Sequence, residues 1–344
     1  MASFYEPNQE QLAWLGTQWI CSYSGGKDST SLVTWLEWLR RFGWITQPKP
    51  RLVLSDTQVE FPSLHLTTQL MIERLTECGW ICETVTPRIN EKLYNQIFGR
   101  GVTLVHPAYR KMRWCTRATK IDPMTRYRKT IGSDLLVLTG SRWGESTARD
   151  ERLLNAGCQA GGECGTNAAQ ENKYSPIVNW TTCQVVDWLS GLVQKSVKDL
   201  IPDLLKISSR LIDIYDVKKG MKGFGLAPPK VSALRFGCIG CPAISTDKTI
   251  EAAVQKHKSS WKPLRKLYWL WAQLRRPENR LPPKSPEKKP GPLKMAARKK
   301  YFDVLLEIQN RAKVTLVNEQ DIAYIHQCWK DEVYPRGWSK EEDR

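Results

Sequence analysis

The stretch "SYSGGKDST" (residues 22–30) lies between the apolar run "WIC" and the segment "SLVTWLEWL", whose apolar residues recur at helical spacing. A strand, a loop of small residues and a helix in this order build an anion cradle. Glycines let the backbone approach an anion, and the first amides of the helix point at it. Hydroxyls and the Lys27 ammonium add further donors. We therefore expect a phosphate site formed by Ser22, Ser24, Gly25, Gly26, Lys27, Asp28, Ser29 and Thr30.

The loop differs from two common phosphate-binding motifs. Its spacing is too short for GxxxxGK[ST], and its glycines do not follow GxGxxG. Asp28 is unexpected here, because its negative charge repels phosphate unless a Mg²⁺ ion or a role on the backbone compensates it. Lys27 and Asp28 are nevertheless the candidates for catalytic residues within the loop.

Strand-like and helix-like segments alternate along the first 195 residues. Strands are expected at 18–24, 51–57, 80–87, 134–146 and 173–180, and helices at 30–42, 63–79 and 183–193. This alternation predicts an α/β fold with a parallel sheet and helices on both faces. Ligands of such sheets bind at the carboxyl ends of the strands. The SGGKDS loop, Asp56 and the turn at Gly140 fall at that edge, so we expect them to share one site.

The pattern changes after residue 195 and predicts three regions. Residues 1–195 form the nucleotide-binding α/β domain, 196–255 a helical segment with a cysteine turn, and 256–344 a basic helical region. Within the last region, "RRPENRLPPKSPEKKPGP" (275–292) is rich in proline and lysine. That composition predicts an extended, mobile loop between two helices.

Positive charge is concentrated in two segments. The chain has a formal net charge of +17, of which residues 256–300 carry fifteen Lys/Arg against two Glu, and residues 106–130 eight Lys/Arg against one Asp. Such concentration favours a polyanionic partner over a uniformly solvated surface. In "SSWKPLRKLYWLWAQLRRP" (259–277), aromatic residues alternate with bases, which suits nucleic acid. A helix that docks on the main domain explains its aromatic half equally well.

The sequence predicts a cytoplasmic protein without a membrane partner. No run reaches the eighteen or so apolar residues of a membrane span, and the N-terminal "MASFYEPNQEQLAWLG" is acidic and lacks the apolar core of a signal peptide. Ten cysteines in such a chain are expected to be reduced rather than paired in disulfides.

One cysteine pair has the spacing of a functional site. "GCIGCP" places Cys238 and Cys241 two residues apart in a glycine turn, which suits a redox pair, half of a zinc site or half of an iron–sulfur site. A zinc ribbon normally has a second CxxC, and this sequence has none. The other ligands are therefore lone cysteines, namely Cys115, Cys158 or Cys164. Four thiolates suit a [4Fe–4S] cluster.

Several motifs together resemble the PP-loop superfamily of ATP pyrophosphatases and phosphoadenylylsulfate reductases. They are SGGKDS, "LSDTQVEFP" (54–62), "GSRWGESTARD" (140–150) and "SPIVNWTTCQVVDWL" (175–189). The resemblance covers about residues 15–195. It implies ATP as cofactor, with the phosphates in the loop and adenine near the end of the second strand. It also implies contacts from Asp56, Gly140 and Arg142, although Arg142 could equally pair with Glu145.

The cysteines resemble those of the DndC/SspD-type proteins of DNA phosphorothioation. That resemblance implies a [4Fe–4S] cluster on Cys115, Cys164, Cys238 and Cys241, with Cys158 as the alternative to Cys164. In the segment after Cys115, Arg113 and Lys120 resemble a phosphate clamp with a catalytic role. A solvated helix face is the alternative reading of these two bases.

The expected function follows from this resemblance. The protein would adenylate a DNA backbone phosphate with ATP and Mg²⁺, so that sulfur can replace an oxygen. Its partners would be DNA on residues 256–300, a cysteine desulfurase as sulfur donor, and other DNA-modification subunits. The alternatives are an adenylylsulfate or phosphoadenylylsulfate reductase, a tRNA thiolation enzyme, and a non-catalytic nucleic-acid-binding subunit that senses nucleotide.

Overall fold

The computed structural model describes residues 5–343 except 105–112, 133–134, 145–149, 152–172, 216–237, 245–249, 252–253, 255–257, 286 and 288. The chain forms two compact units. Unit 1 comprises residues 1–55, 62–85 and 127–234, and unit 2 comprises residues 56–61, 86–126 and 235–344. Both units are therefore built from separated stretches of the chain. The predicted boundaries at 195 and 255 stay predictions.

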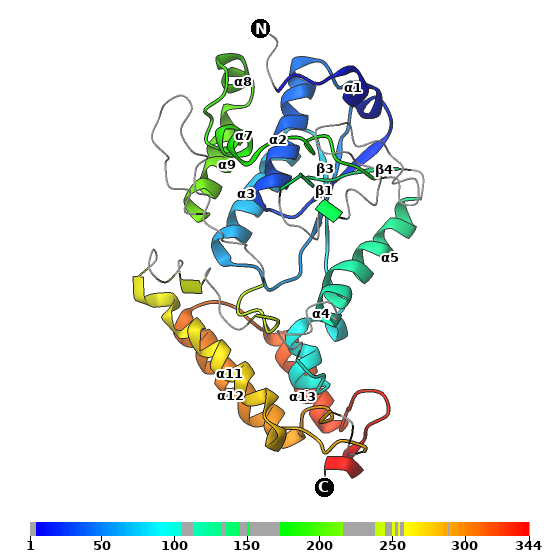
Figure 1. Cartoon of the computed structure of the whole chain (residues 1–344), viewed down its shortest axis with the longest axis vertical. Helices are drawn as coiled ribbons and strands as arrows, with labels where there is room; N and C mark the ends of the chain where they lie inside the picture. The colour runs from blue at the N-terminus through cyan, green and yellow to red at the C-terminus, as the bar shows by residue number, and fades with distance from the viewer. Residues whose placement is uncertain are drawn as a thin grey trace. The chain divides into compact units, whose positions relative to one another are not determined.

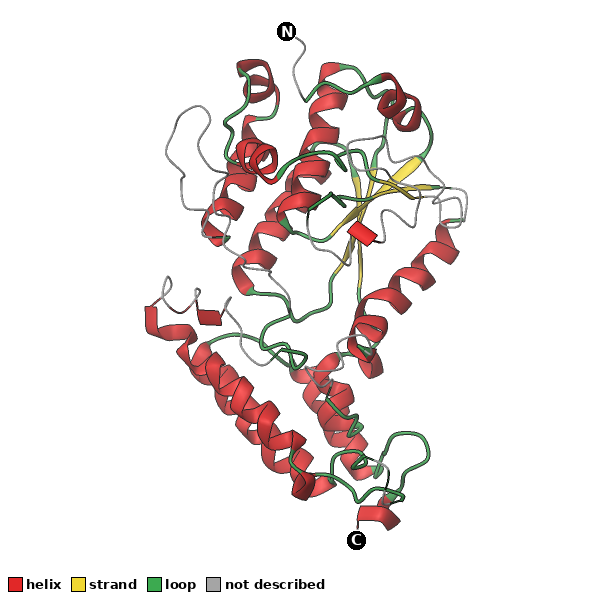
Figure 2. Cartoon of the chain, viewed as in Figure 1, coloured by secondary structure: helices red, strands yellow, loops and turns green. Residues whose placement is uncertain are grey.

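Unit 1 is an α/β layer structure around a parallel sheet of five strands (Figures 1 and 2). The strands are β1 (Trp19–Tyr23), β2 (Arg51–Ser55), β3 (Ile81–Val85), β4 (Leu136–Leu138) and β5 (Lys173–Tyr174). The helices are α1 (Gln9–Leu15), α2 (Lys27–Phe42), α3 (Pro62–Glu77), α7 (Thr182–Leu189), α8 (Lys195–Leu200) and α9 (Pro202–Ile214). This architecture confirms the predicted α/β fold, and the helices after β5 agree with the helical character expected there.

The strand order β3-β2-β1-β4-β5 positions the site. From β1 the chain moves outward to β2 and β3, and it then returns to place β4 on the other side of β1. The point between β1 and β4 is thus the topological switch point, where ligands of open parallel sheets bind. The SGGKDS loop follows β1 and the Gly140 turn follows β4, so both predicted loops lie at this point.

The packing of unit 1 explains the apolar strands and the apolar faces of the helices in its sequence. α2 packs on β1, and α7, α8 and α9 pack on α2. The tryptophans of α2 are buried, and the ring of Trp38 packs against Trp188 of α7. Glu37 is the charged residue enclosed in this layer; it accepts hydrogen bonds from Arg40, Arg41 and Trp80 at 2.7–2.8 Å.

Two strands are shorter than the sequence predicts. β4 covers Leu136–Leu138 rather than the longer run expected from 134, and β5 covers two residues rather than 173–180. Beyond β4, the amide of Thr139 donates to Tyr174, and that of Trp143 donates to the Val178 carbonyl at 3.0 Å. The backbone groups after these strands are therefore satisfied by irregular pairing instead of a regular ladder.

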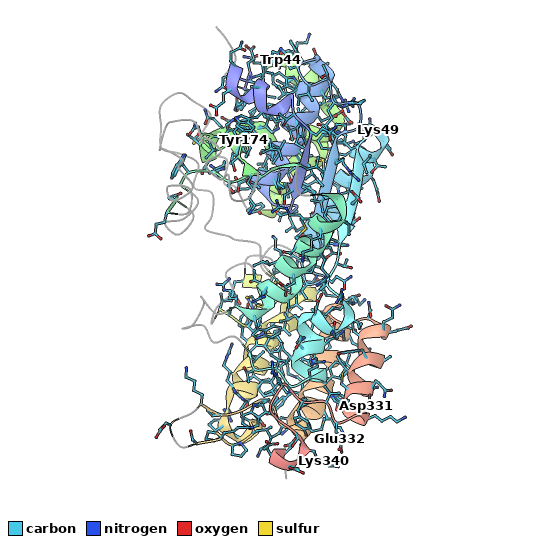
Figure 3. All side chains as sticks on the ribbon, turned by 90° about the vertical axis from the view of Figure 1, so that its right-hand side faces the viewer. Trp44, Lys49, Tyr174, Asp331, Glu332 and Lys340 are labelled. Atoms are coloured by element: carbon cyan, nitrogen blue, oxygen red, sulfur yellow. The ribbon has the colours of Figure 1, made fainter. Side chains whose placement is uncertain are left out.

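Unit 2 is helical. It contains α4 (Trp114–Thr116), α11 (Lys266–Arg275), α12 (Met295–Ala312) and α13 (Glu319–Lys330), with the short turns η1 (Ile89–Glu91), η2 (Asn95–Gly99), η4 (Arg117–Ile121), η6 (Lys258–Arg265), η7 (Pro277–Asn279) and η8 (Lys340–Asp343). Helix α5 (Asp122–Ile131) contains the boundary between the units. Lys340 of η8 pairs with Glu332, and both are labelled in Figure 3.

The prolyl–lysyl segment 275–292 differs from the expected mobile loop. Leu281 pairs with the C-terminal end of the segment: the Leu281 amide donates to the Pro292 carbonyl, and the Gly291 amide donates to the Leu281 carbonyl, both at 2.8 Å. Leu281 and Leu293 are fully buried. The composition of the segment indicated solvent exposure, but burial of Leu281 within it and of Leu293 directly after it anchors the chain here.

None of the helices in the described part of the chain is long and apolar enough to cross a membrane.

Candidate functional site

The SGGKDS loop has the backbone geometry of an anion cradle. Gly26 is the N-cap of the sixteen-residue helix α2, and among the described residues no side chain caps it. The first bond of the helix runs from the Thr30 amide to the Gly26 carbonyl. The amides of Lys27, Asp28 and Ser29 precede that bond, so they are available to an anion together with the positive end of the helix dipole.

At two positions only glycine fits, because neighbouring atoms lie too close to leave room for a Cβ. Gly25 has φ +70°, and a Cβ there would lie 2.1 Å from Thr68 Oγ1. A Cβ on Gly140 would lie 2.9 Å from the backbone of Asp28 and Ser29. The turn after β4 therefore rests directly on the first turn of α2. The predicted convergence of Gly140 with the loop is present, and the contact is between backbones.

The hydroxyls of the loop serve mostly to hold its shape. Ser24 and Ser29 share a hydrogen bond at 3.1 Å, and Ser29 also donates to the Gly26 carbonyl. Thr30 is fully buried and its hydroxyl bonds Tyr23, so it supports the loop from the interior. Ser24 is the exposed hydroxyl, and Ser22 is half-buried in β1. Ser24 is thus the side chain best placed to reach a ligand.

Asp28 is neutralised by two cations of the protein. Its Oδ2 accepts from Lys27 Nζ at 2.5 Å, and its Oδ1 accepts from Arg142 Nε at 2.6 Å. Arg142 is 2% exposed and also donates to the Trp180 carbonyl at 2.8 Å. These two bonds direct Arg142 to the protein itself, and its predicted role as a nucleotide contact stays a prediction. They also resolve the charge conflict that suggested Mg²⁺ beside Asp28.

The ionisation of Asp28 follows from these contacts. Burial alone would raise the pKa of its carboxyl, but the charges and hydrogen bonds of Lys27 and Arg142 outweigh burial and lower that pKa. Asp28 is therefore an anion in the folded protein. Of its two partners, Lys27 can turn toward an incoming phosphate, whereas Arg142 is fixed by its second bond.

The segment after β2 contains Asp56, which was predicted, and a second carboxylate, Glu60, which was not among the predicted site residues. Asp56 accepts from the Gln58 amide at 2.8 Å, and Gln58 has φ 62°, which is unusual for a residue other than glycine. Glu60 accepts from the Thr57 hydroxyl at 2.5 Å and from the Thr57 and Val59 amides. Burial and the charge of Asp56 raise the pKa of Glu60. The sequence signal for Glu60 was the motif "DTQVEF" (56–61), in which a second acid follows Asp56 by four residues.

Three of the predicted thiols gather in unit 2. Burial and the charge of Cys241 raise the pKa of Cys115, and burial with the charges of Cys241, Glu60 and Cys115 raises that of Cys238. The three sulfurs therefore lie within electrostatic range of one another, although Cys115 and Cys238 are far apart in sequence. Cys158 and Cys164 lie outside the described residues.

The backbone of the CxxC turn is held by three side chains of α11 and by one backbone hydrogen bond. Gly240 has φ 58°, and a Cβ there would lie 2.4 Å from Leu267. Trp271 Nε1 donates to the Gly240 carbonyl at 2.6 Å, and Arg275 donates to the Pro242 carbonyl. The Ile239 amide donates to Val59 at 2.7 Å, which joins the turn to the segment that contains Glu60. These contacts hold the turn that contains the two cysteines.

The described residues do not by themselves complete a metal site. Within them, no three His, Cys, Asp or Glu side chains form a group that could hold a metal ion. The buried hydroxyl of Tyr94, however, has no hydrogen-bond partner in this part of the chain, and Cys238 and Cys241 act on it electrostatically. The donor chemistry suits a thiolate-bound group, but a complete set of ligands is not formed by these residues.

The predicted clamp residues lie with the thiols in unit 2. Arg113 and Lys120 are exposed; Arg113 lowers the pKa of Cys115 and Lys120 that of Cys238, in each case against the dominant effect of burial. Lys120 is part of η4, a π-helical turn, and such turns are frequent at functional sites. The structure thus brings Arg113 and Lys120 to the cysteines.

The basic segment 256–300 is less basic at its surface than in its sequence. Arg298 is fully buried and donates to the carbonyls of Leu293, Gly99 and Val333. Arg275 and Arg280 also donate to backbone carbonyls, namely those of Pro242, Pro290 and Gly291. Part of the positive charge therefore stabilises the fold. The exposed remainder includes Lys262, Lys299 and Lys300.

Aromatic residues of the same segment divide into two sets. Trp271 is fully buried, whereas Trp269 of the same helix is 47% exposed. Lys266 Nζ lies 5.9 Å from the Trp269 ring centroid, and the ring of Tyr301 lies 6.2 Å away. Lys266 also pairs with Glu307 at 2.8 Å, so the charges of this ammonium and this carboxylate compensate each other. Trp269 and Lys266 form the exposed aromatic–basic patch of unit 2.

Comparison with known proteins agrees with the site in unit 1. No curated protein matches the chain. The family model described as "Phosphoadenosine phosphosulfate reductase domain" matches residues 18–197, just over half of the chain, and this range contains β1, the SGGKDS loop, the Gly140 turn and α7. The chain therefore belongs to the phosphoadenosine phosphosulfate reductase domain family, whose members use adenine nucleotides.

Proposed function

We propose that this protein is an ATP pyrophosphatase-type sulfurtransferase component that activates a DNA backbone phosphate for replacement of oxygen by sulfur. The observation that carries the proposal is the uncapped first turn of α2 at the β1/β4 switch point, in a domain of a nucleotide-using family. The cysteines and the exposed aromatic–basic patch of unit 2 support the sulfur and DNA parts of the proposal.

The proposed reaction has two steps. A non-bridging oxygen of the DNA phosphate attacks the α-phosphorus of ATP, the bond between the α- and β-phosphates breaks, and pyrophosphate leaves. A sulfur nucleophile then attacks the activated DNA phosphorus, and AMP leaves with the original oxygen. The oxygen is thus carried away in AMP, and the DNA keeps sulfur in its place.

The residues of the loop would serve the first step. The amides of Lys27, Asp28 and Ser29 stabilise the negative charge that develops on pyrophosphate, because they are oriented before the reaction. Lys27 exchanges Asp28 for a phosphate oxygen, while Arg142 remains the counter-ion of Asp28 and holds the first turn of α2. Mg²⁺ would enter with ATP as its phosphate-bound ion.

The thiols would hold the sulfur chemistry. We propose a [4Fe–4S] cluster on Cys115, Cys238 and Cys241, with Cys164, or in its place Cys158, as the fourth ligand. The electrostatic proximity of the three described thiols and the unpartnered Tyr94 hydroxyl support it. When bound, the cluster would hold or relay sulfur or organise the site. Arg113 and Lys120 would bring positive charge to the same place.

DNA would bind the exposed bases of residues 256–300. Lys262, Lys299 and Lys300 are exposed, and Trp269 offers a face for stacking. A cysteine desulfurase would supply the sulfur, and other DNA-modification subunits would choose the modified sequence. If this surface binds DNA through phosphate contacts, affinity falls steeply as salt rises; a flat salt response contradicts the assignment.

A second function is favoured by the family itself. The matched model is named for reduction of phosphoadenylylsulfate, and the same loop would bind that nucleotide. Cys328 is 4% exposed in α13, and burial raises the pKa of its thiol. It is therefore poorly suited to act as the nucleophilic cysteine that a reductase would need. This observation favours the ATP-dependent reaction over the reductase.

One assay separates the candidates. Pyrophosphate release from ATP is measured without oxygen while duplex DNA, tRNA or sulfite is offered in parallel, and reduction of phosphoadenylylsulfate is followed in a separate reaction. Release stimulated by DNA supports the proposal. Release stimulated by tRNA alone refutes the DNA assignment, and reduction without pyrophosphate release identifies a reductase. A Gly140→Ala variant is the control for activity that depends on the loop.

A further inference from the structure

Tyr94 directly precedes η2 in unit 2. Its side chain is 2% exposed, and its ring stacks on Trp271 with centroids 6.2 Å apart and an interplanar angle of 23°. A tyrosine in so closed a place must satisfy its hydroxyl or lose stability, because burial removes the water that would otherwise bond it.

That hydroxyl has no hydrogen-bond partner within the residues that the structure describes. Two other tyrosines of the chain have partners for their hydroxyls. The Tyr23 hydroxyl shares a bond with Thr30 at 3.2 Å, and the Tyr334 hydroxyl donates to Asp343 at 2.6 Å. Phenylalanine would fill the site of Tyr94 equally well and without the cost of an unmet donor. The hydroxyl therefore calls for a partner that the described chain does not supply.

The surroundings of Tyr94 identify the chemistry of that partner. Trp271, on which the ring stacks, donates to the carbonyl of Gly240, which lies between Cys238 and Cys241 in the sequence. Burial raises the pKa of Tyr94, and the charges of Cys238 and Cys241 raise it further. A phenol donates hydrogen bonds, and the sulfur of a metal-bound thiolate or sulfide accepts them, so sulfur held at this turn is the partner that suits Tyr94.

We propose that the Tyr94 hydroxyl donates a hydrogen bond to sulfur, thiolate or sulfide, in the metal-bound site of Cys238 and Cys241. Tyr94 is thus a positioning residue that stabilises negative charge on sulfur, and hydrogen bonds to sulfur tune both affinity and potential at such centres. The inference rests on the thiol site of the proposed function and adds one residue to it.

The test is Tyr94→Phe, measured in the full chain with and without metal. In the metal-free protein the variant removes an unmet donor, so it should melt about 2–4 °C higher than the wild type. With Co²⁺ as the probe, titrated without oxygen and followed by its sulfur-to-metal absorption band, the variant should bind roughly ten-fold more weakly. The two effects have opposite signs, which a purely structural role of Tyr94 would not produce.

Tyr334→Phe is the matched control, because it deletes a hydroxyl that is bonded in the same unit. It should melt lower than the wild type and bind Co²⁺ unchanged. If the wild type binds no Co²⁺ through its thiols, the thiol site is refuted and this inference with it. If Co²⁺ binds equally to the wild type and Tyr94→Phe, or if the metal-free variant is not stabilised, the role of Tyr94 is refuted while the thiol site stands.

Discussion

Replacement of Arg142 by Met tests the account of the nucleotide loop most directly. Methionine keeps much of the length and apolar stem of arginine but removes its charge and donors. In the wild type, the Arg142 side chain is 2% exposed, and it bonds Asp28 and the Trp180 carbonyl at 2.6 and 2.8 Å. The variant therefore removes one hydrogen bond from the largely buried Asp28 carboxylate and one from the Trp180 carbonyl.

The contacts allow an order-of-magnitude expectation. Removing one partner of a buried ion pair costs about 3–5 kcal/mol, because the other charge stays buried. Lys27 remains 2.5 Å from the second oxygen of Asp28, which favours the lower end, and the bond lost at Trp180 adds about 1 kcal/mol. We expect a loss of about 3–4 kcal/mol in the free energy of unfolding, or roughly 6–16 °C in melting temperature.

The pH dependence gives the sign of the effect. The pKa of Asp28 is lower in the folded state than its ordinary value of 3.8, so the folded state favours the anion. Its contribution to stability is complete above the unfolded pKa and is lost as the pH falls through the folded pKa. Arg142→Met raises the folded pKa. The variant should therefore lose less stability than the wild type when the pH is lowered below 4.

The assay is urea denaturation of the wild type, Arg142→Met, Asp28→Asn and the double variant. Coupling between the two sites should exceed about 1 kcal/mol, because they form one hydrogen-bonded pair. Additive effects, or a loss below 1 kcal/mol in Arg142→Met, would refute the reasoning. ATP affinity, measured by calorimetry, should also fall in Arg142→Met, since the first turn of α2 is no longer held in place.

Three further predictions concern the loop, the core and the patch. Gly140→Ala should abolish ATP binding because its Cβ would meet backbone at 2.9 Å, whereas Gly16→Ala, which meets only ordinary contacts at 3.4 Å, should bind normally in the same calorimetric titration. Glu37→Gln should lower the free energy of unfolding by about 3 kcal/mol, because it removes a buried charge with four hydrogen bonds; the exposed Glu77→Gln should change it by less than 0.5 kcal/mol in urea. Trp269→Ala should weaken the binding of single-stranded DNA by roughly ten-fold and Trp269→Phe much less, because stacking needs an aromatic face; equal affinities in fluorescence anisotropy would exclude stacking at this residue.

Local pattern was sufficient for most of unit 1 and for part of unit 2. The predicted strand at 51–57 is β2, the helix at 30–42 is most of α2, and the helical region expected at 256–344 contains α11, α12 and α13. These segments are long and regular in their periodicity, and burial of their apolar face agrees with their local preference. The ends of the short strands β4 and β5 were harder to predict, because the backbone groups beyond them form irregular hydrogen bonds instead of a regular ladder.

The sequence by itself determined the strand, the glycine loop and the helix of the anion cradle, since these depend on residues next to one another. The tertiary structure alone decided which charge meets which. Arg142 reaches Asp28 across 114 positions, and Arg298 is buried on carbonyls although its neighbours Lys299 and Lys300 are exposed. The charge of a residue follows from its type, but the free energy of that charge depends on its partners and its burial. Only the packed fold sets these two factors.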